Sequence, residues 1–155
     1  MKAPLSTDIN VPVAEVWKAW TSREALERWL APKANISFRE GGAWEFFWSD
    51  DPAKDSSLGC KILKIEPERL LRFEWQGKTE FLDMFLPPRG KRTAINVRFE
   101  KTASGTRVAL VQEETRNDAK WAAYESWMSK AWEMALQGLK KHCEEAKMPA
   151  GREKI

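Results

Sequence analysis

The spacing of apolar residues changes twice along the chain and predicts three blocks of structure. A short extended stretch runs from Leu5 to Val11, and Pro12 then suits the first turn of a helix. Apolar residues recur at helical spacing in the next two segments: Val13, Val16, Trp17 and Trp20, then Ala25, Leu26, Trp29 and Leu30. Because Thr21 or Ser22 can cap the second segment and Pro32 ends it, the chain is expected to begin with one strand and two short helices.

From residue 34 the apolar period becomes two, which is typical of strands that bury one face. We expect strands at 34–39, 44–48, 59–66, 70–75, 93–100 and 106–114. The first four form two antiparallel hairpins, and Gly41-Gly42 supplies the turn of the first, since glycine adopts positive φ at no steric cost. The alternation places Trp44, Phe46 and Trp48 on one face of their strand.

The segment from Gln76 to Arg92 is the least regular part of the chain. Phe81 to Leu86 is strongly apolar but is interrupted by Asp83, and two prolines follow directly. The pattern fits an edge strand or an apolar loop that closes over the interior, and we favour a short strand with a long connection.

The last predicted element is a helix from about Asp118 to Lys147. At 100° per residue its large apolar side chains fall in one wide arc: Trp121, Tyr124, Trp127, Met128, Ala131, Trp132, Ala135, Leu136 and Leu139. Polar residues fill the opposite side. An apolar face this wide indicates that the helix is wrapped by other elements.

This order of elements predicts an α+β fold, in which a curved antiparallel sheet of six or seven strands covers the C-terminal helix. The chain of 155 residues is 43% hydrophobic and 32% charged, which is within the range of globular proteins. We expect a single domain over residues 1–147 and a flexible tail over 148–155.

Three stretches carry a resemblance to a known family. Val11 to Thr21, Leu26 to Trp29 and Arg39 to Phe46 resemble the opening of the START and birch-pollen-allergen (SRPBCC, helix-grip) superfamily, in the branch of the activator of the heat-shock-protein-ninety ATPase homologue. Ile65 to Leu70 and Gly105 to Val108 continue the resemblance. It implies a helix-grip fold. Relatives in this superfamily include lipid and hormone carriers, cyclases and co-chaperone domains, so the resemblance implies several functions.

Charge and cysteine content narrow the possible partners. The 26 basic and 23 acidic residues are interleaved, giving a net charge of +3, so we expect no nucleic-acid partner; Arg89, Lys91 and Arg92 are taken as a solvated loop. Cys60 and Cys143 are predicted to be free thiols in a reducing compartment. No apolar run is long enough to form a signal peptide or a membrane span, which points to the cytoplasm.

The ionisable residues suggest no catalytic centre. His142 lies in the last turns of the final helix, where the helix dipole favours a cation, and with Cys143 it supplies only two metal ligands. We therefore expect no catalytic residue, no metal and no cofactor. Glu125 projects near the apolar arc, where burial would raise its pKa and let it bind a donor on a ligand; the alternative is a carboxylate that reaches solvent or pairs with an arginine.

The aromatic residues are the strongest candidates for a binding site, because ligand pockets are mostly apolar with few polar groups. The predicted ligand-binding residues are Phe38, Trp44, Phe46, Trp48, Trp75, Phe85, Tyr124, Glu125, Trp127, Met128 and Ala131. Of the nine tryptophans, Trp44, Trp48, Trp75 and Trp127 are expected to wall a cavity, and the remaining five, Trp17, Trp20, Trp29, Trp121 and Trp132, to pack between helices. The competing interpretation is that all of these rings simply fill a core.

Three functions remain open on the sequence. The first is a non-catalytic protein that binds an apolar small molecule or lipid between the sheet and the long helix. The second, implied by the resemblance, is a protein that stimulates a chaperone ATPase. The third is a cyclase-like enzyme that uses Glu125 or Tyr124 as its acid. The oligomeric state is left open between monomer and homodimer.

Overall fold

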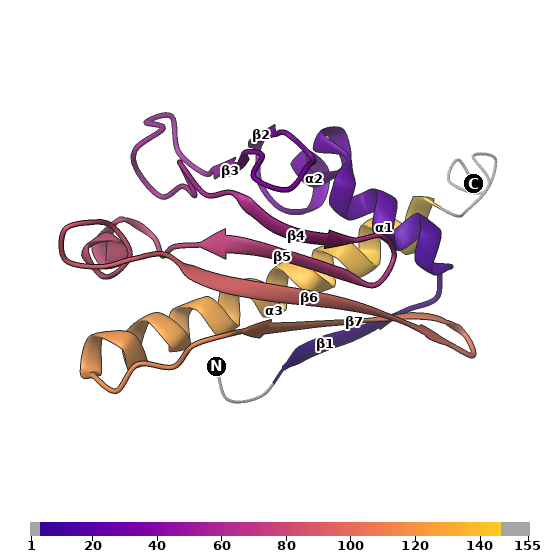
Figure 1. Ribbon diagram of the computed structural model, residues 1–155. Helices are drawn as coiled ribbons and strands as arrows, with labels where there is room; N and C mark the ends of the chain where they lie inside the picture. The colour runs from indigo at the N-terminus through magenta and orange to yellow at the C-terminus, as the bar shows by residue number, and fades with distance from the viewer. Residues whose placement is uncertain (1–3, 147–155) are drawn as a thin grey trace.

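The computed structural model describes residues 4–146, in which a long helix crosses one face of a five-stranded antiparallel sheet (Figure 1). The strands are β1 (Leu5–Ile9), β2 (Lys33–Ile36), β3 (Trp44–Phe47), β4 (Ile62–Glu66), β5 (Leu70–Trp75), β6 (Thr93–Thr102) and β7 (Gly105–Gln112). The helices are α1 (Val13–Thr21), α2 (Arg23–Trp29), η1 (Thr79–Met84) and α3 (Ala119–Ala146). The predicted tail at 148–155 lies outside the described residues.

The seven strands form two sheets that meet at one edge. Five are ordered β1-β7-β6-β5-β4, and β2 pairs with β3 in a separate two-stranded sheet. The two sheets are joined because Trp44 N donates to Cys60 O at 2.9 Å and Ser57 N donates to Phe46 O at 2.9 Å, on the chain that leads into β4. The predicted helix-grip architecture and its two hairpins are confirmed.

The two N-terminal helices form as their sequence predicts. Ser22 caps α2, since its hydroxyl accepts a hydrogen bond from Ala25 N at 3.3 Å. Trp29 at the end of α2 donates from its indole N–H to Ala19 O of α1 at 2.8 Å. This bond links α2 to α1; α2 also packs against β2, and α1 packs against β6 and β7 (Figure 1).

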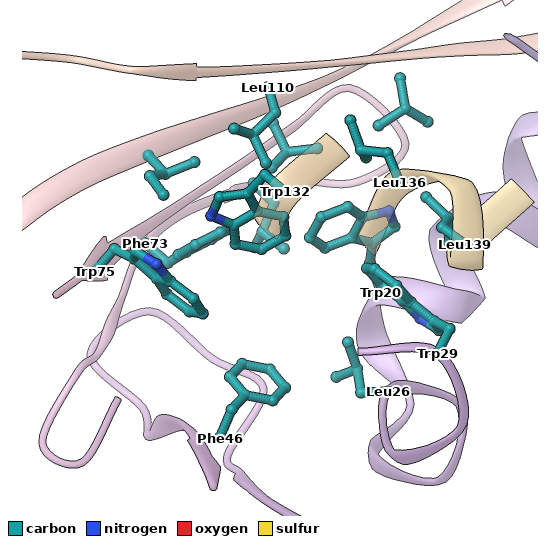
Figure 2. Packing of buried hydrophobic residues seen from close by; sticks show 14 of the residues in the cluster. Trp20, Leu26, Trp29, Phe46, Phe73, Trp75, Leu110, Trp132, Leu136 and Leu139 are labelled. Carbon is teal, nitrogen blue, oxygen red and sulfur yellow. The ribbon is translucent and has the colours of Figure 1, made fainter. Parts of the chain in front are cut away.

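Helix α3 packs on the sheet through one stripe of side chains. Its buried residues are separated by three or four positions: Trp121, Tyr124, Met128, Trp132, Leu136, Leu139 and Cys143. Trp132 lies between Trp75 of the sheet and Trp20 of α1 in Figure 2. Its ring centroid is 5.0 Å from that of Trp75 and 6.2 Å from that of Trp20. The Trp132 side chain therefore connects α3 to both the sheet and α1.

The prediction of a short strand between Gln76 and Arg92 is wrong, because this segment contains the 3₁₀ helix η1. Helical spacing brings Phe81 and Phe85 to one side, where both rings contact Tyr124 of α3, with centroids 5.7 and 4.7 Å away. Both rings are buried in these contacts, which stabilise the helical conformation of the segment.

Candidate functional site

A cavity of about 380 Å³ lies between the first half of α3 and the adjoining ends of β3 and β5. Four indole rings line it, those of Trp48, Trp75, Trp127 and Trp132. The remaining lining residues are Leu30, Asp55, Ser56, Ser57, Gln76, Gly77, Lys78, Met128, Ala131 and Ala135. The wall is thus aromatic and aliphatic, with its polar groups supplied by two loops.

Three parts of the chain supply the aromatic wall: the end of β5, α3 and the residue that follows β3. Trp48 and Trp75 meet edge to face, with centroids 6.3 Å apart and an angle of 82° between the rings. Trp75 in turn contacts Trp132 at 5.0 Å. Trp127, one position before Met128 on α3, contacts Phe81 of η1 at 5.9 Å. The first three rings therefore form a continuous surface, and Trp127 joins the cavity to η1.

Most polar groups at the cavity are already hydrogen-bonded within the protein. The Ser57 hydroxyl accepts from Phe46 N at 2.8 Å and donates to Trp44 O at 3.2 Å. Gln76 donates to Ser56 O at 2.9 Å and accepts from the Arg92 guanidinium at 3.0 Å. These groups hold the loop at 49–59 against the end of β5, so they shape the cavity more than they offer contacts to a ligand.

Asp55 and Thr79 connect the two loops that border the cavity. Asp55 N donates to the Thr79 hydroxyl at 2.9 Å, and Thr79 N and its hydroxyl each donate to Asp55 Oδ1 at 3.1 Å. Asp55 adopts a positive φ of 48°, a conformation that costs a non-glycine residue free energy. The three hydrogen bonds offset that cost.

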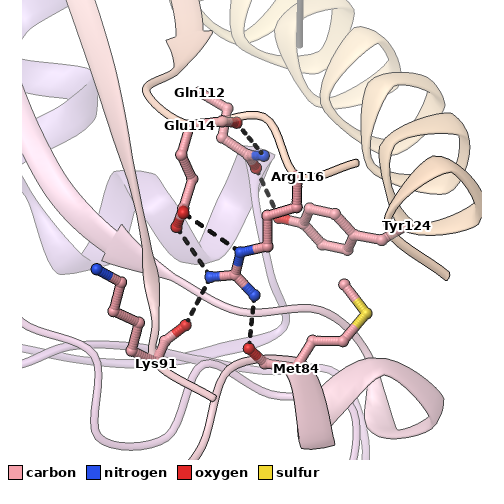
Figure 3. A network of polar contacts seen from close by, with 6 residues as sticks. All are labelled: Met84, Lys91, Gln112, Glu114, Arg116 and Tyr124. Atoms are coloured by element: carbon pink, nitrogen blue, oxygen red, sulfur yellow. Dashed lines mark hydrogen bonds and ion pairs between the residues drawn. The ribbon is translucent and has the colours of Figure 1, made fainter. Parts of the chain in front are cut away.

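Arg116 holds the segment after η1 in place (Figure 3). Its guanidinium donates to Met84 O at 2.7 Å and to Lys91 O at 3.0 Å, and it forms an ion pair with Glu114 at 2.9 Å. The same group lies over the Trp121 ring, 4.7 Å from its centroid. Arg116 therefore satisfies two loop carbonyls and packs η1 against the start of α3.

Two further hollows lie outside the cavity. One of about 360 Å³ is lined by Pro32, Lys33, Phe47, Trp48, Ser49, Asp50 and Pro52, so Trp48 borders both spaces. The Trp48 indole N–H donates to Leu30 O at 3.2 Å, and the side chain is 43% exposed. The other hollow, of about 490 Å³, is lined in part by His142 and Cys143 at the opposite end of α3.

The structure brings together five of the predicted ligand-binding residues at the cavity, and the other six do not line it. Trp48, Trp75, Trp127, Met128 and Ala131 line the cavity. The residues that do not line it are Phe38, Trp44, Phe46, Phe85, Tyr124 and Glu125. Of these, four are fully buried in the core: Trp44, Phe46, Phe85 and Tyr124. That these side chains bind a ligand is untested and stays a prediction.

The division of the tryptophans also changes. Trp44 was expected at the cavity wall but packs against Phe46 and Phe73 in the core, at 5.0 and 5.1 Å. Trp132 was assigned to helix packing and does stack on Trp20, yet it also lines the cavity. The position of Trp132 four residues after Met128, on the same face of the helix, was the sequence signal that could have placed it at the cavity. No sequence signal pointed to the loop residues Asp55 and Lys78.

Titratable groups in the interior are held in their neutral forms. Burial raises the pKa of the Cys60 thiol to about 12, against the opposing effect of Arg92. Burial also raises the pKa of Tyr124 well above its usual value, and the phenol donates to Gln112 Oε1 at 2.9 Å. Partial burial, and then the charge of Arg28, lower the pKa of His142. Among residues 4–146, no three His, Cys, Asp or Glu side chains gather as metal ligands would.

Comparison with known proteins identifies the family. Residues 10–144 match the family described as Activator of Hsp90 ATPase homolog 1-like protein. The chain belongs to this family. A search of curated proteins found no match. No helix within the described residues has the length and apolar character needed to cross a bilayer.

Solved structures of similar fold support the family architecture. Protein MLL2253 from Mesorhizobium loti superposes with a TM-score of 0.75 at 21% identity, covering 94% of this chain and 98% of its own. CalU16 from Micromonospora echinospora gives 0.62 at 23% identity, over 97% and 80% of the two chains. DynU16, from the dynemicin biosynthetic locus, gives 0.69 at 16% identity, over 94% of this chain and 48% of its own. At these identities the likeness extends to the fold alone.

Proposed function

We propose that this protein is a non-catalytic binding protein for an apolar, ring-containing small molecule that occupies the cavity beneath α3. The observation that carries the proposal is the convergence of Trp48, Trp75, Trp127 and Trp132 on one space of about 380 Å³. Where the indole rings do not fill the space between them, their apolar faces can contact a ligand. A flat aromatic face buries most area against a flat ligand.

The size of the cavity favours a compact ligand. Small-molecule sites usually enclose about 300–1,000 Å³, so this cavity is at the small end of the range. A single molecule of two or three rings matches such a space better than a long-chain lipid.

The two cysteines are free and buried, which agrees with the reducing environment of the cytoplasm as the proposed location.

A cyclase-like function receives less support. The two acids considered for it, Tyr124 and Glu125, are both outside the cavity lining. The Tyr124 phenol is bonded to Gln112, and burial raises its pKa well above the ordinary value, so it is held as a neutral structural donor. Activation of a chaperone ATPase rests on the family description alone. The large exposed apolar residues are Trp48 and Leu58, in the connection between β3 and β4, and Met134 on α3.

The proposal is tested with a neutral two-ring probe, 1-naphthalenemethanol. Binding is measured by isothermal titration calorimetry, and the contact site is located by NMR, in which the indole N–H groups of the nine tryptophans report on their own surroundings. We expect saturable binding with shifts at the four cavity indoles and smaller shifts at Trp17 and Trp29.

Two matched variants locate the site independently. Both alanines are exposed on α3, but Ala131→Leu adds bulk at the cavity lining, whereas Ala123→Leu adds the same side chain outside it. Leucine and alanine both favour helix, so both variants should fold. We expect Ala131→Leu to weaken binding at least tenfold and Ala123→Leu to leave it unchanged. Absence of saturable binding in the parent protein, or equal binding by both variants, would overturn the proposal.

A further inference from the structure

The charged groups at the cavity are Asp55 and Lys78, and they are not equivalent. The Lys78 ammonium forms an ion pair with Glu80 at 2.7 Å. Asp55 is exposed, and it has no ion-pair partner among residues 4–146. Its Oδ1 accepts from Thr79 N and from the Thr79 hydroxyl, and within residues 4–146 its Oδ2 accepts no hydrogen bond. The uncompensated charge at the cavity is therefore negative.

Other polar side chains at the cavity do not alter this balance. The Ser57 hydroxyl and both ends of the Gln76 amide are engaged in hydrogen bonds within the protein. The Ser56 hydroxyl donates to Pro52 O at 2.7 Å. A charged group on a ligand would thus find the Asp55 carboxylate without a counter-charge, whereas Glu80 already neutralises the Lys78 ammonium.

The aromatic wall favours the same sign of charge. The face of an indole ring carries negative potential and attracts cations, whereas it repels anions. Lys78 already illustrates the attraction, since its ammonium lies 5.5 Å from the centroid of Trp127. Three further indoles line the space.

We propose that the ligand class is a hydrophobic amine: a compact ring system that packs against the indoles of Trp75 and Trp132, with a protonated amino group directed to Asp55. This inference rests on the proposed function and adds the charge of the ligand to it. Because Asp55 is exposed, water screens the attraction, and the expected preference is about fivefold, decreasing as salt is added.

Three probes that share one ring system separate the alternatives. They are 1-naphthylmethylamine, neutral 1-naphthalenemethanol and anionic 1-naphthaleneacetate, each titrated into the full chain by calorimetry at neutral pH. We expect the amine to bind about fivefold tighter than the alcohol, and the acid to bind weaker than both.

Substitutions at Asp55, Asp51 and Lys78 test which residue causes the preference for the amine. Asp55→Asn keeps the side-chain oxygen that accepts from Thr79, and asparagine tolerates the positive φ of 48° at this position. It should reduce the preference for the amine over the alcohol, leaving only the part due to the indole rings, without affecting the alcohol. Asp51→Asn, in the same loop but outside the cavity lining, is the control and should keep the preference. Lys78→Gln should leave amine binding intact or strengthen it.

The outcomes distinguish this inference from the proposed function. If the alcohol binds but the amine binds no tighter, the cavity is a binding site and the inference fails. Tighter binding of the acid, lost in Lys78→Gln, would reverse the sign of the proposed ligand charge. If none of the three probes binds saturably, the proposed function itself fails, and the inference with it.

Discussion

The indole rings of Trp20 and Trp132 lie stacked, with their centroids 6.2 Å apart and only 15° between their planes. Trp20 belongs to α1 and Trp132 to α3, so the pair joins the N-terminal helices to the helix that the sheet encloses. The other side of Trp132 borders the cavity. The cavity wall at this point is therefore part of the core, and its shape depends on the packing of α1.

Trp132 and Trp127 should differ in their contribution to stability. Trp132 is 3% exposed, and truncation to alanine leaves a hole among aromatic rings, so Trp132→Ala should lower the free energy of unfolding by about 3–5 kcal/mol. Trp127 is partly exposed, and Trp127→Ala should cost less than half as much. Urea unfolding measures both. Equal losses would show that Trp132 does not have the structural role described.

Thr79→Val should accelerate ligand exchange. Valine has nearly the shape of threonine but removes two of the three hydrogen bonds to Asp55, those made by the hydroxyl. The loops at the cavity should then separate more often, so both the association and the dissociation rate of 1-naphthalenemethanol should rise several-fold with little change in affinity. NMR exchange measurements give both rates. The exposed Thr115 provides the control Thr115→Val, and unchanged rates in Thr79→Val would exclude loop opening as the limiting step.

Arg116→Lys should loosen the segment from 85 to 92. Lysine keeps the charge but not the planar group that donates to Met84 O and Lys91 O together. We expect amide hydrogen exchange in this segment to increase at least tenfold, corresponding to the loss of about 1–3 kcal/mol of local stability. Arg89→Lys is the matched control in the same segment, because Arg89 is largely exposed. Equal exchange in both variants would contradict the role given to Arg116.

Ionisation of Cys60 should destabilise the protein in alkali. Burial raises the pKa of this thiol from 9.0 to about 12, so the unfolded chain loses the proton at a lower pH than the folded protein. The associated stability is complete below pH 9.0 and decreases as the pH rises toward 12. Unfolding measured below and above pH 9.0 should show a smaller decline in Cys60→Ala than in the parent chain. An identical decline would contradict this assignment.

His142 should titrate below its ordinary pKa of 6.5. Partial burial disfavours the charged imidazole, and the charge of Arg28 adds to the effect. The free energy of unfolding should therefore decrease as pH falls from 6.5 toward the lowered pKa. The chain has one histidine, so its NMR titration is unambiguous. Arg28→Gln should raise the midpoint and Arg23→Gln should not; a midpoint at or above 6.5 in the parent chain would refute the prediction.

Most of the fold could be predicted from the regular spacing of apolar residues. The arc of apolar residues predicted on the last helix contains every side chain that α3 buries except Cys143. Alternation located the strands because one face of each is buried, and the turn at Gly41 has the expected positive φ of 82°. These features depend on local spacing, which a sequence records directly.

The site depends on tertiary geometry that spacing does not record. Trp44 and Trp48 share one face of an extended segment, yet Trp44 is fully buried and Trp48 is 43% exposed, because the strand reaches the edge of the sheet between them. Thr79–Met84 is helical because α3 offers Tyr124 as a partner for its phenylalanines. Asp55 reaches the cavity through a loop whose course is set by bonds to distant residues.

The indole of Trp48 is the partition between the cavity and the neighbouring hollow of about 360 Å³. Its ring N–H donates a hydrogen bond to Leu30 O at 3.2 Å. Because Trp48 follows β3 rather than belonging to it, we expect a smaller side chain at this position to join the two spaces and leave the strands in register. Trp48 is accordingly the position at which we expect a substitution to change the size of the guest that the fold admits.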